Sequence, residues 1–283
     1  MAEISIKNVS FYHGKGTPYQ IKALDDVSLD IKHGIVTGII GHTGSGKSTL
    51  VELFNGILKP EEGKVLLDGE DIWAKPKEIR GVRFRVGLVM QYPESQLFEE
   101  TIRQDIAFGP KNMGLSVEEI EIRVKEAARF VGLDEEMLDK SPFDLSGGQK
   151  RRAAIAGIIA MRPEVLILDE PAAGLDPAGR EAIFSNIIEY KKQTGSTVVI
   201  VSHSMEDMAR YCDEIAVMSG GKLLMMGSRD EVFSDTEKLV SAGLDIPQIT
   251  KLMLLLEKKG ISVDSGIYTS ENAYKEIIKL FKI

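Results

Sequence analysis

The stretch with the clearest chemical capacity is rich in glycine and lies between an apolar run and a helix-like run. Its spacing is G-x-x-x-x-G-K-S, from Gly41 to Ser48. Glycines let a backbone curl so that several N–H groups point at one anion, and the following helix adds the positive end of its dipole. We expect Lys47 to reach the terminal phosphates of a nucleotide and the Ser48 hydroxyl to bind Mg²⁺. The predicted phosphate site consists of Gly41, Thr43, Gly44, Ser45, Gly46, Lys47, Ser48 and Thr49.

Two acidic side chains follow a second apolar run, which spans residues 165–168. A continuous apolar run of this length is typical of a central parallel strand, and the two acids would emerge at its carboxyl end. We expect Asp169 to belong to the Mg²⁺ shell and Glu170 to orient or deprotonate an attacking water. Without the glycine-rich loop, the same two acids could simply cap a strand.

Two other predicted strands end in polar side chains that could reach the same place. Gln91 follows the strand at 86–90, and His203 follows the strand at 197–201. Because ligands of parallel α/β sheets bind outside the carboxyl ends of the strands, Gln91 could touch the metal or the attacking water. His203 could sense the terminal phosphate. Taken singly, either residue could equally be structural.

A second possible anion site begins at Leu145 and reads Leu-Ser-Gly-Gly-Gln. Ser146 can cap the alanine-rich helix that follows, and the two glycines let its N-terminus approach an anion closely. Alone, this pattern fits an ordinary helix start equally well. Asp176 is expected to cap a further helix.

These groups need a scaffold, which the apolar patterning predicts in outline. Alternating residues at 3–11 and 23–31 indicate a half-exposed antiparallel sheet, and 12–19 reads as a loop whose aromatic rings could stack on a purine or pack at the surface. Residues 101–140 are helical in pattern, and 215–226 reads as a hairpin. The final stretch, from about residue 239, gives short amphipathic helices. The predicted class is α/β with a small helical appendage.

Composition limits the possible functions of the chain. The 283 residues carry a formal charge of −8, which argues against nucleic-acid binding because phosphate backbones attract Lys and Arg. Cys212 is the only cysteine, so no disulfide can form within the chain, and we expect it to be a small buried apolar residue. No uncharged apolar run approaches the roughly 20 residues that span a bilayer, and the first residues alternate like a strand. We expect a cytosolic chain unless a membrane partner holds it.

Taken together and in this order, the motifs resemble those of an ATP-binding-cassette ATPase. The Leu-Ser-Gly-Gly-Gln signature separates this family from kinases, GTPases and helicases, which share only the phosphate loop and the acidic strand. The resemblance implies a P-loop NTPase fold, with a RecA-like core, an antiparallel β subdomain and an inserted helical subdomain at about 92–160. It assigns residues 1–235 to the cassette and 236–283 to a C-terminal helical appendage that helps to hold two ATPases together.

The family also implies a mechanism shared between two chains, with ATP and Mg²⁺ as cofactors. Two cassettes face each other head to tail, and each ATP lies between the phosphate loop of one chain and the signature of the other. An aromatic ring before the loop stacks on adenine, and this sequence offers Tyr12 or His13. The implied signature and nucleotide-site residues are Ser146, Gly147, Gly148, Gln149 and Asp176.

Within the family, the segment from Gln91 to Phe98 and residues 105–112 look like the ATPases of energy-coupling factor transporters, which import vitamins and transition-metal ions in prokaryotes. Residues 243–248 are similar too, and residues 153–157 and 177–180 look most like the A-prime paralogue. This resemblance favours a paralogous cassette over a second copy as the partner ATPase. It also implies a transmembrane coupling subunit docked at 91–98, a substrate-binding membrane subunit, and a peripheral location on the cytoplasmic face of the cell membrane.

Two other functions compete with this one. A soluble cassette acting on nucleic acid or ribosomes would carry either a long coiled coil between Lys47 and Ser146 or two cassettes in one chain. This sequence has neither sustained heptads in that interval nor a second cassette. A cassette that binds ATP without efficient turnover is the other alternative, and the presence of both Glu170 and His203 argues against it.

Overall fold

The computed structural model describes residues 3–281. The first two residues of the predicted cassette, 1–2, and the last two of the predicted appendage, 282–283, lie outside the described residues. At its centre is a six-stranded sheet in the order β10-β9-β3-β8-β7-β6. All neighbours pair in parallel except β9 and β10, which form the predicted hairpin. The strands are β3 (Val36–Ile40), β6 (Val86–Val89), β7 (Val165–Asp169), β8 (Thr197–Val201), β9 (Glu214–Ser219) and β10 (Lys222–Ser228).

The central strands read as continuous apolar runs because both faces of this sheet are covered. Successive residues point to opposite faces, so Ile39 enters one buried core and Ile40 the other. Ile167 and Leu168 alternate in the same way on β7. Each strand is therefore held on both faces by buried side chains, which fixes the position of the polar residues at its end.

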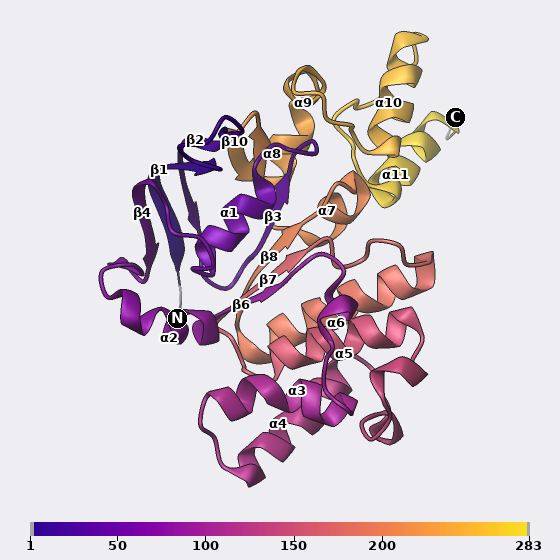
Figure 1. Ribbon diagram of the computed structural model, residues 1–283. Coiled ribbons are helices and arrows are strands. Elements are labelled where there is room, and N and C mark those ends of the chain that lie inside the picture. Colours follow the sequence, from indigo (N-terminus) through magenta and orange to yellow (C-terminus); the bar gives the residue numbers. More distant parts are fainter. Residues whose placement is uncertain (1–2, 282–283) are drawn as a thin grey trace.

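The first core is closed by a four-stranded antiparallel sheet in the order β2-β1-β4-β5. In Figure 1, helix α1 (Lys47–Phe54) lies beside this sheet, and its Leu50, Leu53 and Phe54 are fully buried in the core that the two sheets share. The burial of α1 fixes the position of the loop before it. The strands are β1 (Ile4–His13), β2 (Ile21–Ile31), β4 (Glu62–Leu67) and β5 (Glu70–Asp71).

The prediction of a loop at residues 12–19 is wrong at its start. Strand β1 runs on to His13, because Tyr12 pairs with Lys22 and His13 pairs with Ile21 across the hairpin. Tyr12 and His13 are therefore strand residues, because of a pairing between strands that the composition of this segment does not reveal. The connecting loop is consequently confined to residues 14–20.

The second core joins the central sheet to a group of helices in the lower part of Figure 1. The helical pattern predicted over 101–140 is confirmed, and it is interrupted where Gly114 and Gly132 adopt left-handed conformations that end α3 and α4. The buried Cys212 belongs to this core, as expected. The lower helices are α3 (Ile102–Asn112), α4 (Val117–Phe130), α5 (Gly147–Ile159) and α6 (Pro177–Thr194). Helix α7 (Met205–Tyr211) is buried in the same core, whereas α2 (Ile79–Arg85), which precedes β6, packs on the first core.

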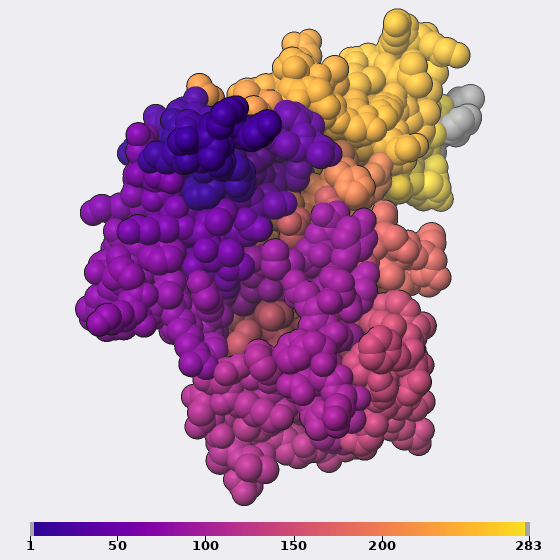
Figure 2. All heavy atoms as spheres, in the orientation of Figure 1, coloured from indigo at the N-terminus to yellow at the C-terminus, as the bar shows by residue number. Residues whose placement is uncertain are grey.

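The C-terminal helices form the orange and yellow part along the top of Figures 1 and 2, with α10 and α11 at the upper right. Leu239 and Ile246 are buried in the second core, whereas Leu252 and Leu255 are 41% and 58% exposed. No helix among residues 3–281 combines the length and the apolarity needed to cross a bilayer. The helices of this part are α8 (Arg229–Ser234), α9 (Thr236–Ser241), α10 (Gln248–Lys258) and α11 (Ser270–Phe281).

Candidate functional site

The glycine-rich loop links β3 to α1 and wraps tightly, as its composition predicts. A Cβ on Gly41 would lie 2.4 Å from the Met218 carbonyl oxygen, and Gly46 has a φ of 99° that other residues rarely adopt. Helix α1 has neither a side-chain cap nor an acidic residue in its first turn. Its first N–H groups therefore have no partner within the helix and are available to an anion.

Lys47 lies inside the curl of this loop. Its Nζ donates hydrogen bonds to the carbonyl oxygens of Gly41, at 2.7 Å, and His42, at 3.0 Å. Burial lowers the pKa of Lys47, while the nearby carboxylates of Glu170 and Asp169 raise it. A cation held by weak carbonyl acceptors can exchange them for phosphate oxygens, which are stronger partners.

Ser48 and Asp169 come together from distant parts of the chain. The Ser48 hydroxyl donates to Asp169 Oδ2 at 2.9 Å, and Asp169 is only 8% exposed. Burial raises the pKa of Asp169, against the lowering effect of the Ser48 hydrogen bond. A hydroxyl and a carboxylate beside a phosphate-binding loop are oxygen ligands of the kind that Mg²⁺ prefers, so these residues fit that ion.

Glu170 follows β7 in a left-handed conformation, with φ of 51°. Its N–H donates to the Val201 carbonyl oxygen at 2.9 Å, which ties it to the end of β8. Its Oε1 lies 2.8 Å from His203 Nδ1, and its Oε2 accepts from the Ser202 hydroxyl at 3.4 Å. Sequence reasoning gave Ser202 no role, yet this buried hydroxyl helps to orient the carboxylate.

Gln91 lies just beyond β6, beside the strand that carries Asp169. Its side chain is exposed, and within residues 3–281 it takes part in none of the hydrogen bonds. The structure thus brings Gln91 to the predicted edge of the sheet without joining it to Ser48 or Asp169. Its contact with metal or water stays a prediction.

The two aromatic candidates before the loop differ in their surroundings. His13 Nε2 lies 3.0 Å from Thr49 Oγ1, directly after the metal-site hydroxyl. Tyr12 is adjacent on the strand, and the Lys22 ammonium lies 5.5 Å from the centre of its ring. Successive strand residues point to opposite faces. Of the two rings, His13 is the one that forms a hydrogen bond with the phosphate loop.

The signature stretch lies on the helical subdomain. Ser146 accepts from the Gln149 N–H at 3.4 Å, and the Gln149 side chain accepts from the Ser146 N–H at 2.9 Å, so the predicted cap of α5 is present. A Cβ on Gly147 would meet no atom within 4 Å. None of the hydrogen bonds of the described chain joins this stretch to the phosphate loop. Asp176 caps α6 as predicted, accepting from the Gly179 N–H at 2.7 Å.

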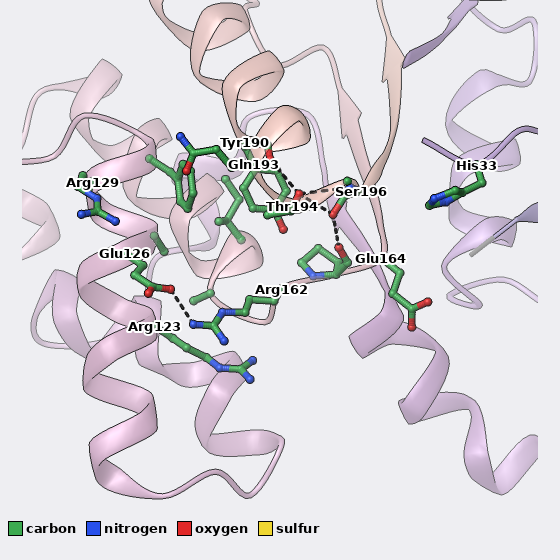
Figure 3. Close-up of a pocket in the computed structure, with 16 residues that line it drawn as sticks. His33, Arg123, Glu126, Arg129, Arg162, Glu164, Tyr190, Gln193, Thr194 and Ser196 are labelled. Atoms are coloured by element: carbon green, nitrogen blue, oxygen red, sulfur yellow. Dashed lines mark hydrogen bonds and ion pairs between the residues drawn. The ribbon is translucent and has the colours of Figure 1, made fainter. Parts of the chain in front are cut away.

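A cavity of about 650 Å³ lies at the other end of the central strands (Figure 3). Ser196, which precedes β8, donates to the Pro163 carbonyl oxygen at 2.9 Å, and Arg162 pairs with Glu126 at 2.7 Å. Figure 3 shows both contacts among the residues that line this cavity. Because Asp169 and Glu170 lie at the carboxyl end of β7, this cavity is separate from the phosphate site.

Comparison with known proteins identifies the family of this chain. The family described as ABC transporter matches residues 24–173, and a second, described as AAA domain, putative AbiEii toxin, Type IV TA system, matches 140–208. The energy-coupling factor transporter ATP-binding protein EcfA2 of Clostridium tetani is 52% identical over 98% of this chain and 97% of its own. The protein of the same name from Clostridioides difficile is also 52% identical, over 99% of this chain and 98% of its own.

Solved structures give the same result for the fold. The cbiO1 protein of Clostridium perfringens, described as part of the ABC transporter complex cbiONQ, matches with a TM-score of 0.75 and 41% identity, over 89% of this chain and 98% of its own. The ATP-binding cassette MJ0796 bound to ADP and Pi matches at 0.72 and 29% identity, over 80% and 98%. The P-loop NTPase fold predicted from the motifs is confirmed. The chain belongs to the ABC transporter ATPases, and among them to the ATP-binding subunits of energy-coupling factor transporters, which couple ATP hydrolysis to import.

Proposed function

We propose that the loop from Gly41 to Thr49 holds the phosphates of ATP and that Lys47 leaves its carbonyl partners to bind the β- and γ-phosphates. Ser48 and Asp169 would hold Mg²⁺, together with Gln91 from the neighbouring strand. When bound, this ion offsets phosphate charge that would otherwise repel an attacking water. The 2.9 Å contact between Ser48 and Asp169 supports this assignment.

Hydrolysis then depends on Glu170. Its carboxylate orients a water toward the γ-phosphorus and takes a proton as the new P–O bond forms and the bond to the ADP oxygen breaks. His203, which is 2.8 Å from Glu170 Oε1 and largely exposed, would hold the carboxylate and contact the γ-phosphate. The single observation that carries this role is the convergence of Lys47, Asp169, Glu170 and His203 at one sheet edge.

We further propose that the signature acts on ATP held by a second cassette, so that Ser146, Gly147, Gly148 and Gln149 complete the partner's site. The absence of any atom within 4 Å of a Cβ at Gly147 supports this, because its own chain does not require glycine there. Asp176, at the start of α6, would lie at the same two-chain junction. Either a paralogue or a second copy could supply the other half, and the family resemblance favours a paralogue.

Replacing Gly147 with Asp tests this arrangement. An acidic residue in the first turn of α5 favours the helix dipole, so we expect the melting temperature to stay equal or rise. A carboxylate beside the partner's γ-phosphate should nevertheless lower ATP turnover of the assembled pair by about 100-fold, the usual order for losing one such anion contact. Turnover assays and thermal unfolding measure both effects. Val117→Asp, at the exposed start of α4, is the control, and equal turnover in both variants would contradict the proposal.

For adenine, we propose stacking on His13. The 3.0 Å contact with Thr49 places this ring next to the phosphate loop, whereas Tyr12 lies against Lys22. The test compares the affinity of each variant for ATP with its affinity for inorganic triphosphate, which has no adenine. His13→Ala should lower the affinity for ATP but not the affinity for triphosphate. Tyr12→Ala should change neither affinity.

We propose that a transmembrane subunit docks on the segment from Gln91 to Phe98. Beside it lies a groove of about 330 Å³ lined mostly by apolar side chains of α2, α3 and α5, and Figure 2 shows the surface hollowed between the purple and magenta parts of the chain. Phe98 is 65% exposed at its rim and packs edge-on against Phe108. In the groove wall, Asp105 Oδ1 accepts from the N–H groups of Phe98, at 3.1 Å, and Glu99, at 3.2 Å, so this buried carboxylate fixes the backbone at the rim.

Phe98→Asp should therefore weaken co-purification with the membrane subunit by about 10-fold or more, because an apolar rim residue becomes a charge at an interface. ATP binding by the separate chain should not change, because Phe98 lies far from the phosphate loop in sequence and, within residues 3–281, none of its ring or hydrogen-bond contacts is with that loop. A pull-down from detergent extract measures the first effect and equilibrium titration the second. Val117→Asp again serves as the exposed apolar control, and undiminished co-purification of Phe98→Asp would contradict docking at this rim.

The whole assembly, in this proposal, is an importer at the cytoplasmic face of the cell membrane, in which a separate membrane subunit binds the cargo, a vitamin or a transition-metal ion. The exposed Leu252 and Leu255 of α10 offer a surface for the partner ATPase. The test is purification of this chain from native membranes with its partners retained, followed by mass identification. A paralogous ATPase with a polytopic membrane protein and a small binding protein is the expected result. Ribosomes or nucleic acid instead would favour the soluble alternative, which the charge of −8 disfavours.

A further inference from the structure

One arginine of the signature helix is buried although it stands in a run of basic residues. Arg151 is 4% exposed, whereas its neighbours Lys150 and Arg152 are only partly buried. A guanidinium cannot lose its charge within the range of pH in which proteins are stable, so its burial requires partners that meet its hydrogen-bonding groups. Other segments of the chain must therefore supply them.

Two distant segments do so. Arg151 donates from Nε to Glu94 Oε2 at 3.0 Å and from Nη2 to Glu94 Oε1 at 2.8 Å, which is a bidentate ion pair. Its Nη1 donates to the carbonyl oxygen of Ala173. Partial burial raises the pKa of Glu94, but the hydrogen bond and charge of Arg151 hold it below its ordinary value. The pair is thus ionised at neutral pH.

Each partner belongs to a segment with a role at the ATP site. Glu94 lies in the short 3-10 helix η2 (Pro93–Gln96), which follows Gln91 and begins at the buried Pro93. Ala173 closes a tight turn, since its N–H donates to the Glu170 carbonyl oxygen at 3.1 Å. Arg151 itself lies little more than one helical turn beyond Ser146. One side chain therefore joins the docking segment, the signature helix and the turn that carries the catalytic carboxylate.

We propose that Arg151 is a positioning residue that sets the turn at Glu170 according to the position of the 91–98 segment. Docking of the membrane subunit moves Glu94, and the rigid guanidinium fork passes that movement to Ala173 and to the signature helix. This inference rests on the proposed docking at 91–98. Arg151 touches neither ATP nor the attacking water, so its effect is on turnover in the assembled complex and not on nucleotide binding by the chain.

The test compares Arg151→Lys and Glu94→Gln with Arg123→Lys in the full complex in membranes. Lysine keeps the charge but cannot bond two carboxylate oxygens and a carbonyl at once. Arg123 is the matched control, because it also pairs with a carboxylate, Glu119 at 2.7 Å, and donates to a carbonyl oxygen, that of Met161, and neither partner belongs to the 91–98 segment or to the turn at 170–173. We expect Arg151→Lys to lower kcat about 10- to 100-fold, as small misplacements of catalytic groups do, with the KM for ATP changed less than about twofold. Arg123→Lys should leave both nearly unchanged.

Further measurements separate this role from mere loss of structure. The affinity of the separate Arg151→Lys chain for ATP should equal that of the wild type, and Glu94→Gln should still co-purify with the membrane subunit. The Arg151→Lys and Glu94→Gln effects on kcat should not add in the double variant, because both break the same contact. Equal kcat values for Arg151→Lys and Arg123→Lys, or a loss confined to KM, would overturn the inference while leaving the transporter function intact. A wild-type complex that hydrolyses no ATP would instead overturn the proposed function.

Discussion

Replacing Glu170 with Gln is expected to lower kcat for ATP hydrolysis by about 100- to 10,000-fold, the range associated with removing a general base. The amide keeps the shape of the carboxylate and can still contact Ser202 and His203, but it cannot take the proton of the attacking water. The phosphate loop is unchanged, so ATP should bind as before and accumulate in a stable two-cassette complex. Single-turnover assays, with size-exclusion chromatography in ATP, measure both results.

Glu164→Gln is a suitable control for that experiment. Glu164 precedes the same strand, β7, at its opposite end, where it pairs with Arg85 at 2.5 Å and is 40% exposed. This ion pair is remote from the phosphate loop, so its loss should not alter kcat. If Glu170→Gln turned over ATP as fast as Glu164→Gln, another group would have to activate the water.

The second large effect is expected from Lys47→Ala, which should weaken ATP binding by about 100-fold or more. Hydrogen bonds to a charged group contribute about 1.5–3 kcal/mol each, and the ammonium that now donates to Gly41 and His42 would make at least two to phosphate. Two such bonds correspond to about 3–6 kcal/mol, or more than two powers of ten in affinity. Titration of the chain with Mg-ATP measures the change directly.

Lys64, an exposed lysine of β4, provides the matched control for loss of positive charge. Lys64→Ala should bind ATP as the wild type does, which would show that the effect of Lys47→Ala is local and not a matter of net charge. Thermal unfolding of both variants checks that the loop still folds. An ATP affinity of Lys47→Ala within a few-fold of the control would mean that Lys47 keeps its carbonyl partners when nucleotide is bound.

The parts of this molecule that follow from the sequence are those whose chemistry is local. The glycine-rich loop, the signature cap and the two acids at the carboxyl end of β7 each depend on residues adjacent in the chain, so spacing and residue type are sufficient to predict them. The apolar run at 165–168 also predicts a doubly covered strand correctly, because period and composition reflect burial on two faces. From these motifs the family and the ATPase function could be inferred, and both are confirmed.

What the tertiary structure decided is how segments distant in sequence meet. The composition of residues 12–19 indicated a loop, but pairing with β2 extends β1 to His13. This pairing brings the His13 ring within hydrogen-bonding distance of Thr49. In the run Lys150-Arg151-Arg152 the three side chains look alike in sequence, and only the packing of α5 against the 91–98 segment buries the middle one on Glu94. Likewise, Ser202 reaches Glu170 only because β7 and β8 are neighbours. Local sequence fixes which groups can do chemistry, whereas burial and strand order, which are sums of many weak long-range contacts, determine which of them are held together.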